Sequence, residues 1–443
     1  KVGVALAEDL VQEDHNVTMI DTSPERLQTL SEDIDAIKLV GNGASIAMQM
    51  EAGIQTADIL IAVTGSDEMN LLCCLIARKA GKCHTIARVR NPVYSNEINF
   101  IKQTLGISMI INPELAAAME ISRVLRLPSA IRIDPFSRGR VELLKFKVKP
   151  EFRLSGKSVR EIDNQIGGTV LFAGVERGDE VTIPDGNFVL QDGDLVSFIA
   201  TPKNSVGFFH NLGIHTNRAK SVLIVGGGTI SYYLARQLAS MHVRVKIVEK
   251  DRARCEFLTE NLPGALIING DGTDRRLLME EGLTSTEAFV TLTNMDEENV
   301  FLTLFARENC GAKLVTKVNR IAFDELLSKL DLGTLIYPKY ITSDYIIQYV
   351  RAMQNTIGSN VETLYHILDG RAEALEFVIR EKSEVTDIPL MNISLKKNLL
   401  IACINRGGVI HIPRGQDSIQ VGDTVVVVTS QRGLHDIRDI LKK

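Results

Sequence analysis

Short apolar runs alternate with amphipathic segments along the first quarter of the chain. Runs of strand length occur at residues 17–21, 36–39, 59–64, 85–89 and 109–112. Between them, apolar residues recur at helical spacing at 3–13, 24–30, 45–52, 70–80 and 95–105. Strands that alternate with helices across short turns are typical of a doubly wound, mostly parallel sheet. The pattern therefore predicts an α/β fold for this part of the chain.

The same pattern occurs a second time. Strand-like runs return at 222–225, 244–249, 265–268, 288–293, 313–318 and 334–337. Over most of the chain the two copies keep a constant separation of 229 residues, so that Gly41 corresponds to Gly270 and Arg177 to Arg406. A duplication of this length predicts two tandem modules of one fold.

Each module is expected to contain a larger lobe, a crossover helix and a smaller lobe. Pro113 and Pro338 introduce amphipathic helices, expected at about 114–126 and 341–353. Beyond them, short strands with Gly, Pro and Asp turns predict small α+β lobes. Irregular residues at 201–220 suggest the joint between the modules. The expected domains are 1–126 and 213–356, each a larger lobe with its crossover helix, and the small lobes 127–212 and 357–443.

The start of the first module differs from that of the second. The second module begins with a strand and a glycine turn at 221–228, and their counterpart would precede Lys1. From the duplicate we expect about ten further residues before the sequence given.

A glycine-rich turn joins a strand to a helix in the second module. Gly226, Gly228 and Ser231 follow the strand at 222–225 in the spacing G-x-G-x-x-S. The first glycine permits a tight turn, and the second lets backbone amides approach a pyrophosphate at the helix N-terminus. Ser231 is small enough for close packing of helix on strand. The turn therefore predicts a dinucleotide or nucleotide site.

An acidic residue closes the strand after this turn in both modules. Glu249 has this place in the second module and Asp21 in the first, where Gly3 is the remaining third glycine. Such an acid accepts hydrogen bonds from ribose hydroxyls and disfavours a 2′-phosphate. We therefore expect NAD(H) or ATP/ADP rather than NADP(H). The alternative is a nucleotide-binding fold that no longer binds any ligand, and this alternative has more weight for the second module.

Further polar residues follow the carboxyl ends of predicted strands, where such sheets bind ligands. Asn42 and Asp271 follow the third strand of each module, and Thr64 and Thr293 end the fourth. For Asp67, Glu68 and their duplicates, capping of the next helix is the favoured interpretation.

Basic residues at the end of the fifth strand distinguish the modules. Arg88 and Arg90 end it in the first module, where guanidinium groups could clamp phosphates. The second module has Lys317 and Asn319 at these positions. The first module is therefore the better candidate for binding phosphate groups.

Composition excludes several classes of function. The net charge of the 443 residues is −5 without a basic block, which argues against nucleic acid as the main partner. The six cysteines show no C-x-x-C spacing and lie in apolar or helical segments, which favours buried thiols over disulfides. The sequence contains no nucleophile elbow or P-loop and no histidine or lysine in a convincing catalytic setting. We therefore expect a protein that is not an enzyme.

Together these motifs resemble the regulator-of-potassium-conductance family, also called RCK or KTN. The resemblance covers essentially the whole chain and is strongest in the segment 57–64 with Asp67 and Asn70, in the turn 270–273, and in the duplicated turns of the small lobes, such as 176–178 and 405–407. It implies two tandem modules, each a Rossmann-like doubly wound parallel sheet followed by a crossover helix and a small α+β lobe.

The resemblance also implies a function. Modules of this family bind NAD(H), ATP or ADP in the Rossmann clefts, pair through these lobes and gate a membrane potassium transporter as a homo-oligomeric ring, dimer or tetramer. Asp21 and Glu249 would then hold ribose, Gly226 and Gly228 would face the phosphates, and Asn42 and Asp271 would lie near adenosine. Arg88 and Arg90 would reach phosphate. Such a chain would be cytoplasmic and peripheral at the inner face of the cell membrane.

Two other functions stay open from the sequence. One is an NAD-dependent oxidoreductase, which would need a catalytic acid or base. The other is the gating portion of a longer potassium channel or antiporter.

Overall fold

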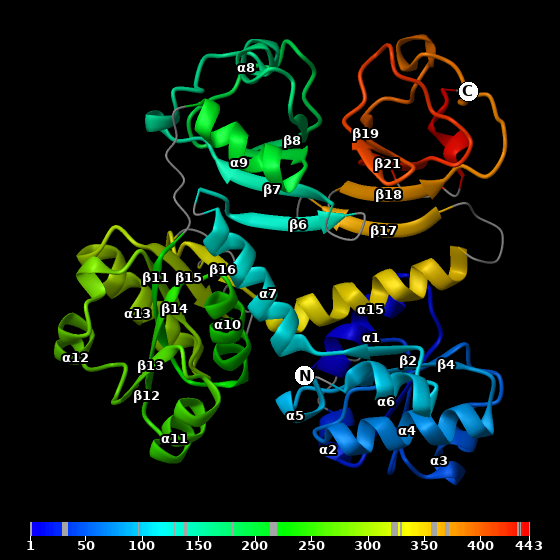
Figure 1. Cartoon of the computed structure of the whole chain (residues 1–443). Coiled ribbons are helices and arrows are strands. Elements are labelled where there is room, and N and C mark those ends of the chain that lie inside the picture. Colours follow the sequence, from blue (N-terminus) through cyan, green and yellow to red (C-terminus); the bar gives the residue numbers. More distant parts are fainter. Residues whose placement is uncertain are drawn as a thin grey trace. The chain divides into compact units, whose positions relative to one another are not determined.

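The computed structural model divides the chain into two compact units (Figure 1). The larger-lobe unit comprises residues 1–122 and 220–347, and the small-lobe unit comprises 123–219 and 348–443. The structure describes residues 2–28, 34–95, 97–127, 129–136, 140–178, 180–212, 219–319, 327, 330–355, 361–367, 372–431, 434 and 436–442. Like lobes of the two modules therefore belong to the same unit.

The second larger lobe is a six-stranded parallel sheet of order β13-β12-β11-β14-β15-β16. Its strands are β11 (Ser221–Val225), β12 (Arg244–Glu249), β13 (Ala265–Asn269), β14 (Ala288–Thr291), β15 (Lys313–Lys317) and β16 (Thr334–Ile336). Its helices are α10 (Thr229–Ser240), α11 (Arg252–Asn261), α12 (Arg275–Glu280), the short η3 (Leu283–Ser285) and α13 (Asp296–Asn309). Figure 1 shows α10 on the opposite side of the sheet from α12 and α13. This strand order is that of a Rossmann fold, so the predicted doubly wound sheet is confirmed.

The first larger lobe repeats this order in two sheets, β1-β2 and β3-β4-β5, all parallel. Its strands are β1 (Val17–Asp21), β2 (Ala36–Val40), β3 (Ile59–Ala62), β4 (His84–Arg88) and β5 (Met109–Ile111). Its helices are α1 (Val2–Gln12), α2 (Pro24–Gln28), α3 (Ile46–Glu51), α4 (Asp67–Ala80), α5 (Pro92–Ser95) and α6 (Ile98–Leu105). The helix expected at 95–105 is α6, which begins three residues later at Ile98 and is preceded by the short α5; α4 begins three residues before its predicted start.

A helix with proline at its first position follows each larger lobe, as predicted. These crossover helices are α7 (Pro113–Arg126) and α15 (Pro338–Asn355). Proline is favoured there because the first turn has no internal partner for its N–H group. Asn112 begins α7 by accepting the Leu115 N–H at 2.9 Å through its side-chain oxygen.

The small-lobe unit contains two five-stranded antiparallel sheets, of order β6-β7-β10-β8-β9 and β17-β18-β21-β19-β20. The first small lobe has β6 (Arg132–Phe136), β7 (Val141–Lys147), η2 (Pro150–Phe152), α8 (Val159–Ile166), β8 (Leu171–Arg177), β9 (Glu180–Thr182), β10 (Leu195–Ala200) and α9 (Pro202–Asn211). The second has β17 (Val361–Ile367), β18 (Ala372–Val378), η4 (Leu390–Asn392), β19 (Leu399–Arg406), β20 (Val409–His411), β21 (Thr424–Thr429) and η5 (Ile437–Ile440). One apolar cluster contains residues of both sheets, including Leu143 and Ala173 of the first and Ala374 and Val426 of the second.

The expected joint at 201–220 was wrong for its first half. Residues Pro202–Asn211 form α9, which begins with Thr201 as its N-cap and Pro202 in its first turn. Phe208 and Phe209 of this helix are fully buried in the core of the first small lobe. Burial of these two aromatic rings outweighs the low helix propensity of the surrounding polar and glycine residues. Residues 213–218 of the expected joint lie outside the described residues.

The thiols lie where the sequence placed them, in apolar surroundings. Five cysteines are buried, and Cys310 is partly buried. Burial raises the pKa of Cys74 and of Cys403 to about 12. Both thiols therefore stay protonated at neutral pH.

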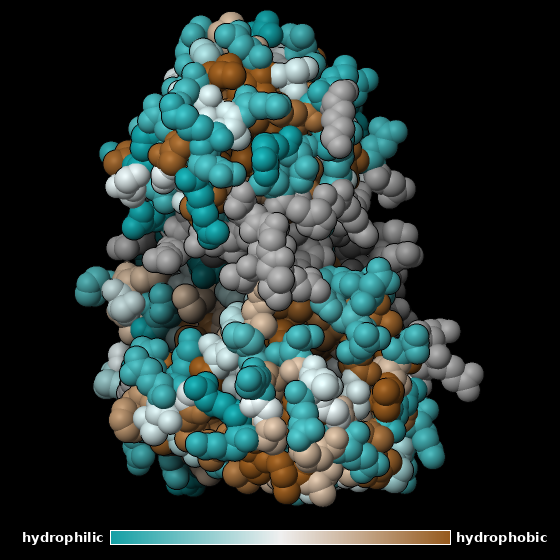
Figure 2. Space-filling model, turned by 90° about the vertical axis from the view of Figure 1, so that its right-hand side faces the viewer, coloured by the Kyte–Doolittle hydropathy of each residue, from teal (hydrophilic) through white to brown (hydrophobic). Residues whose placement is uncertain are grey.

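Exposed apolar side chains occur at equivalent positions of the two larger lobes. Ile37 and Leu266, Met50 and Met279, and Leu72 and Phe301 are each separated by the module offset, and all six are exposed. Hydrophobic side chains gather on the lower part of the face shown in Figure 2, where the first larger lobe is displayed. No helix in the described part of the chain combines the length and apolar character needed to cross a bilayer.

Candidate functional site

The glycine turn of the second larger lobe has the geometry expected from its sequence. Gly226 has a φ of +99°, and a Cβ built on it would lie 2.9 Å from the backbone of Leu292 and Thr293, so only glycine fits. Gly228 is the N-cap of α10, and a Cβ there would meet open space in the described part of the chain. Ser231 is fully buried, and its hydroxyl donates to the Gly226 carbonyl. Its small size lets the helix pack on the turn.

Glu249, expected to hold ribose, is engaged by the chain's own backbone. Its Oε2 accepts the Gly227 N–H at 2.6 Å, and its Oε1 accepts the Asp251 N–H at 2.8 Å. Arg254 donates from Nε to the Gly227 carbonyl at 2.6 Å, and burial lowers the pKa of this guanidinium. A ribose would compete with the turn for this carboxylate. Sequence reasoning missed the contact made by Gly227, which stands at the variable position of the glycine motif, and it missed Arg254, which lies outside the motif.

Asp271 is similarly occupied. Lys250 donates to its Oδ2 at 2.8 Å, and the Thr273 N–H and hydroxyl donate to its Oδ1 at 2.9 and 2.7 Å. These hydrogen bonds, with that of Lys250 the largest cause, hold the pKa of Asp271 well below its usual range. The predicted adenosine contact of the second cleft is therefore an ionised carboxylate paired with a lysine.

Asp21 has the corresponding place in the first lobe. Asp21 ends β1, its Oδ1 accepts the Ser23 N–H at 2.9 Å, and the Arg26 guanidinium is 3.7 Å away. A third of the Asp21 side chain is exposed, at 33%. Asn42 uses its side-chain oxygen to accept the Ala44 N–H at 3.0 Å. Gly3 lies in α1, where an added Cβ would come within 3.2 Å of Val63.

A buried glutamine supports the loop that contains Asn42. Gln49 in α3 is 1% exposed, and its Nε2 donates to the Gly43 carbonyl at 2.7 Å and to the Cys73 carbonyl at 3.1 Å. The equivalent residue of the second lobe is the fully buried Leu278. The first cleft therefore has a polar support for this loop where the second has apolar packing. Only the comparison of the two copies, position by position, could have indicated this residue.

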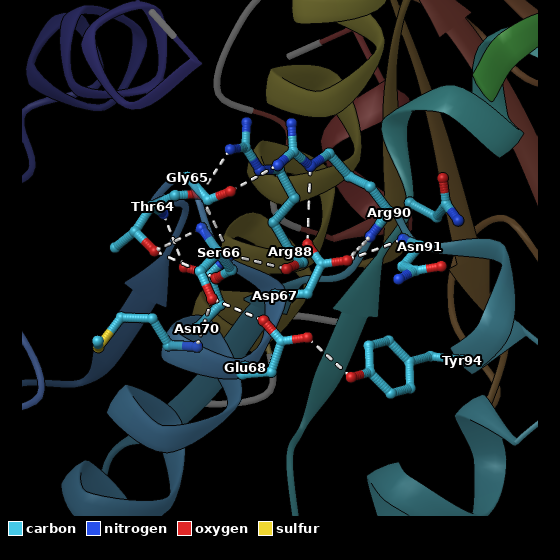
Figure 3. Close-up of polar contacts among 12 residues, drawn as sticks. Thr64, Gly65, Ser66, Asp67, Glu68, Asn70, Arg88, Arg90, Asn91 and Tyr94 are labelled. Carbon is cyan, nitrogen blue, oxygen red and sulfur yellow. Dashed lines mark hydrogen bonds and ion pairs between the residues drawn. The ribbon is translucent and has the colours of Figure 1, made fainter. Parts of the chain in front are cut away.

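Arg88 and Arg90 converge on the loop that follows β3, as Figure 3 shows. Arg88 donates from Nη2 to the Thr64 carbonyl at 2.6 Å, and Arg90 donates from Nη2 to the Gly65 carbonyl at 2.7 Å. Burial lowers the pKa of Arg88, and the neighbouring Arg90 charge lowers it further. Asn70 joins the same loop to β4, since its amide accepts the Thr64 N–H at 2.7 Å and donates to the Arg88 carbonyl at 2.8 Å.

Asp67 holds the end of β4, and the interpretation of this residue as a helix cap was wrong. Ser66 is the N-cap of α4. The Asp67 side chain is 7% exposed, and its Oδ2 accepts the N–H groups of Arg90 and Asn91, each at 2.8 Å. Its Oδ1 lies 3.6 Å from Arg90 Nε. The tertiary partners, two backbone amides and a guanidinium, attract the carboxylate more strongly than the end of its own helix does.

The second lobe keeps this framework without the arginines. Asp296 accepts the Asn319 N–H at 2.9 Å, and Asn299 accepts the Thr293 N–H at 2.9 Å while donating to the Lys317 carbonyl at 3.0 Å. Lys317 is 6% exposed, and burial lowers its pKa. Its ammonium donates to the Asn294 side chain at 3.3 Å. A buried lysine is a weaker partner for phosphate than two arginines.

A buried carboxyl group lies near the arginines. Glu114 is in the first turn of α7. Burial raises its pKa, and the charges of Arg90 and Arg88 lower it by less than burial raises it. Glu114 and Asp67 therefore both oppose the positive charge at this end of the first cleft.

The expected site residues thus lie at the carboxyl ends of parallel strands in each larger lobe. In the first lobe, Arg88, Arg90 and Thr64 are brought into direct contact with one loop. In the second lobe, Gly226, Ser231 and Glu249 form one hydrogen-bonded turn, and Asp271, Thr293 and Lys317 are each paired with neighbouring groups of the protein.

Family models match both kinds of lobe. The TrkA-N domain model matches residues 1–113 and 222–338, and the TrkA-C domain model matches residues 143–206 and 374–442. Each module of the chain therefore contains one match to each domain.

Relatives are similar over the full length of the chain. The Trk system potassium uptake protein TrkA homolog of Archaeoglobus fulgidus is 31% identical over 443 residues, with coverage of 100% of this chain and 98% of the relative. The Trk system potassium uptake protein TrkA of Haemophilus influenzae is 30% identical over 441 residues, covering 98% of this chain and 94% of the relative.

Solved structures share the fold at low identity. The GsuK RCK domain superposes with a TM-score of 0.64 at 17% identity, covering 96% of this chain and 90% of that chain. The GsuK channel bound to NAD gives 0.63 at 16% identity, covering 97% and 75%, respectively. GsuK bound to ADP gives 0.50 at 14% identity, covering 80% and 67%.

Proposed function

Because this chain belongs to the TrkA family of proteins with tandem TrkA-N and TrkA-C domains, we propose that it is a nucleotide-binding regulatory subunit that gates a membrane potassium uptake transporter. The single observation that carries the nucleotide assignment is the pair of Rossmann lobes, with an acid at the end of β1 in the first lobe and of β12 in the second. The solved GsuK structures with NAD and with ADP support it, since they share this fold. We retain the four-domain division 1–126, 127–212, 213–356 and 357–443 as part of the proposal.

The first cleft is the main site for the nucleotide. Asp21 holds the ribose, Asn42 lies beside the adenosine, and Thr64 and Gly3 line the phosphate end. Arg88 and Arg90 bind the phosphates by exchanging their carbonyl partners on the 64–65 loop for phosphate oxygens. The two guanidinium groups favour a ligand with phosphate groups, so ATP, ADP or NAD(H) fits better than adenosine.

The second cleft binds more weakly, because it has Lys317 and Asn319 where the first cleft has Arg88 and Arg90. Gly226, Gly228, Ser231 and Glu249 would approach a pyrophosphate and ribose there. Glu249 must first release an N–H group that it accepts at 2.6 Å. The other residues of that cleft, Asp271, Thr293 and Lys317, likewise would have to exchange protein partners for ligand. In both clefts, each exchange of a protein partner for the ligand reduces the net gain from binding.

Regulation follows from a difference in affinity between two shapes of the assembly. A ligand biases such an equilibrium only by binding one shape more tightly, and each tenfold difference supplies about 1.4 kcal/mol per site. No catalytic step is needed, and the protein acts as a regulator and not as an enzyme. Its partner is a TrkH-like membrane subunit, which it meets from the cytoplasmic face of the membrane.

Self-association is part of the proposal. The exposed apolar residues at equivalent positions, such as Leu72 and Phe301, offer the same kind of surface on both larger lobes. A second copy of the chain can cover these residues by placing the same surface of its own lobes against them. Repeated contacts of this kind build a ring of modules. Light scattering tests this, because a mass of one chain at all concentrations would exclude a ring.

Calorimetry with NADH, NAD, ATP and ADP tests the nucleotide assignment. Asp21→Ala removes the ribose acceptor of the first cleft, and Glu249→Ala removes that of the second. Since a hydrogen bond to a charged group contributes about 1.5 to 3 kcal/mol, we expect Asp21→Ala to weaken the best ligand by about 10- to 100-fold. Glu249→Ala should leave that affinity within about twofold. Absence of binding by all four nucleotides would overturn the proposal.

A further inference from the structure

A tyrosine of the second larger lobe reaches into the first. Tyr233 lies in α10 and is 4% exposed. Its hydroxyl donates to the Arg90 carbonyl at 3.0 Å and accepts from the Asn112 Nδ2 at 2.9 Å. The same Asn112 side chain accepts the Leu115 N–H at the start of α7. One buried hydroxyl therefore joins the second lobe to Arg90, two residues after β4, and to Asn112 at the start of the crossover helix of the first module.

The contact falls on the backbone of a candidate phosphate ligand. The N–H of Arg90 is bound by Asp67 at 2.8 Å, and its carbonyl is bound by Tyr233. Arg90 is thus fixed on both sides of its Cα, and the direction of its guanidinium depends on both contacts. The first of these contacts comes from within the first lobe, whereas the second comes from the other module.

The reciprocal contact is missing from the duplicated position. Since Gly3 corresponds to Ser231, the equivalent of Tyr233 in the first lobe is Ala5. Ala5 has no side-chain hydroxyl, and together with Asp9 and Tyr340 it lines a cavity of about 360 Å³ in the larger-lobe unit. The Tyr233 hydroxyl of the second lobe therefore binds the first lobe, whereas the Ala5 side chain at the matching position cannot donate a hydrogen bond to the second lobe.

Charges from both lobes also meet near this contact. Burial raises the pKa of Glu114 and lowers that of Lys317; the charges of Arg90 and Arg88 oppose the first shift, and the charge of Glu114 opposes the second. The phosphate end of the first cleft therefore interacts with the second lobe through the charges of Glu114 and Lys317 as well as through the hydrogen bond of Tyr233.

We propose that Tyr233 is a positioning residue through which the second larger lobe holds Arg90 in place for phosphate binding in the first cleft. The inference rests on the proposed function and adds to it that the first cleft is complete only when the two lobes are docked. A change in lobe docking would then alter the affinity for phosphates while leaving the adenosine end of the cleft unchanged.

Tyr233→Phe removes the hydroxyl and keeps the ring. Tyr232→Phe is the matched control, because Tyr232 is the neighbouring residue of α10, is 7% exposed, and packs its ring on Tyr233 and Phe257. Calorimetry of the full chain with ATP and with adenosine gives the ratio of the two affinities. A hydrogen bond contributes about 1 kcal/mol, so we expect ATP to bind about fivefold more weakly to Tyr233→Phe. Adenosine should bind Tyr233→Phe and Tyr232→Phe with the same affinity as it binds the unsubstituted chain.

Asn112→Ala is a second variant that removes the other partner of the hydroxyl, and it should reduce the ATP-to-adenosine ratio in the same direction. Thermal unfolding of each variant checks that the fold persists. If the ratio of ATP affinity to adenosine affinity is unchanged in Tyr233→Phe, the positioning role is overturned. This holds whether both affinities stay the same or both fall by the same factor. If the unsubstituted chain binds neither ligand, the proposed nucleotide function fails instead, which is a different result.

Discussion

Removal of the Asp67 carboxylate should loosen the end of β4 and weaken phosphate binding. Asp67→Ala deletes the acceptor of two backbone N–H groups, those of Arg90 and Asn91, both bound at 2.8 Å. It also deletes the ion pair with Arg90 Nε at 3.6 Å. Because the Asp67 side chain is 7% exposed, water replaces these contacts poorly.

The size of the effect follows from these contacts. Two buried donors left without an acceptor cost about 1 to 3 kcal/mol each, and partial relaxation of the loop reduces the sum to about 2 to 4 kcal/mol. Asp67→Asn retains an acceptor oxygen and loses only the charge, so its cost should be about 1 kcal/mol. The two variants therefore separate the role of the hydrogen bond from that of the charge.

Hydrogen exchange measured on the peptide that contains residues 88–94 reports directly on the two amides. We expect protection of Arg90 and Asn91 to fall by at least about tenfold in Asp67→Ala, since 1.4 kcal/mol corresponds to a factor of ten. ATP affinity measured by calorimetry should fall with it, because Arg90 loses its fixed position, whereas adenosine affinity should not.

Asp296→Ala is the matched control, because Asp296 accepts the Asn319 N–H at the equivalent place of the second lobe. It should loosen residues 317–319 and leave ATP binding to the first cleft unchanged. Unaltered exchange of residues 88–94 in Asp67→Ala would refute the structural part of the reasoning. Faster exchange with full ATP affinity would refute the link from Asp67 to phosphate binding.

Two other substitutions test the energetics of the fold. Arg406→Leu leaves the carboxylate of Asp423, which is 1% exposed, without the bidentate partner that binds it at 2.9 and 2.8 Å. We expect the free energy of unfolding of the second small lobe, measured in urea, to fall by about 2 to 3 kcal/mol. This is less than for a fully buried pair, because the Arg406 side chain is 40% exposed. A fall below about 0.5 kcal/mol would contradict this expectation. Burial raises the pKa of Glu114, so the folded state binds its proton more tightly and this contribution to stability is lost as pH rises through the raised pKa. Glu114→Gln should therefore gain stability relative to the unsubstituted chain as pH rises from about 4.3, and a difference independent of pH would exclude the buried charge as its cause.

Local sequence rules account for most of the helices and strands. The apolar period placed every strand of the two larger lobes, since a parallel strand covered by helices is recognisable as a short continuous apolar run. The turn at Gly226 was also predictable, because its φ of +99° and the 2.9 Å approach to Leu292 are requirements that only glycine meets. The wrong assignments fell at 201–211 and at Asp67. In both places partners distant in sequence decide the structure.

What the sequence by itself determined is the duplication, the alternation of strands and helices that is typical of a doubly wound sheet, and the residue types available at the carboxyl ends of the strands. Which of these residues stay open to a ligand was decided by tertiary structure. Glu249, which the pattern assigns to ribose, accepts two backbone N–H groups of its own lobe, from Gly227 and Asp251. Tyr233 meets Arg90 across 143 residues of chain. Hydrogen-bond partners at such separations depend on how the lobes pack, and no local period in the sequence contains that information.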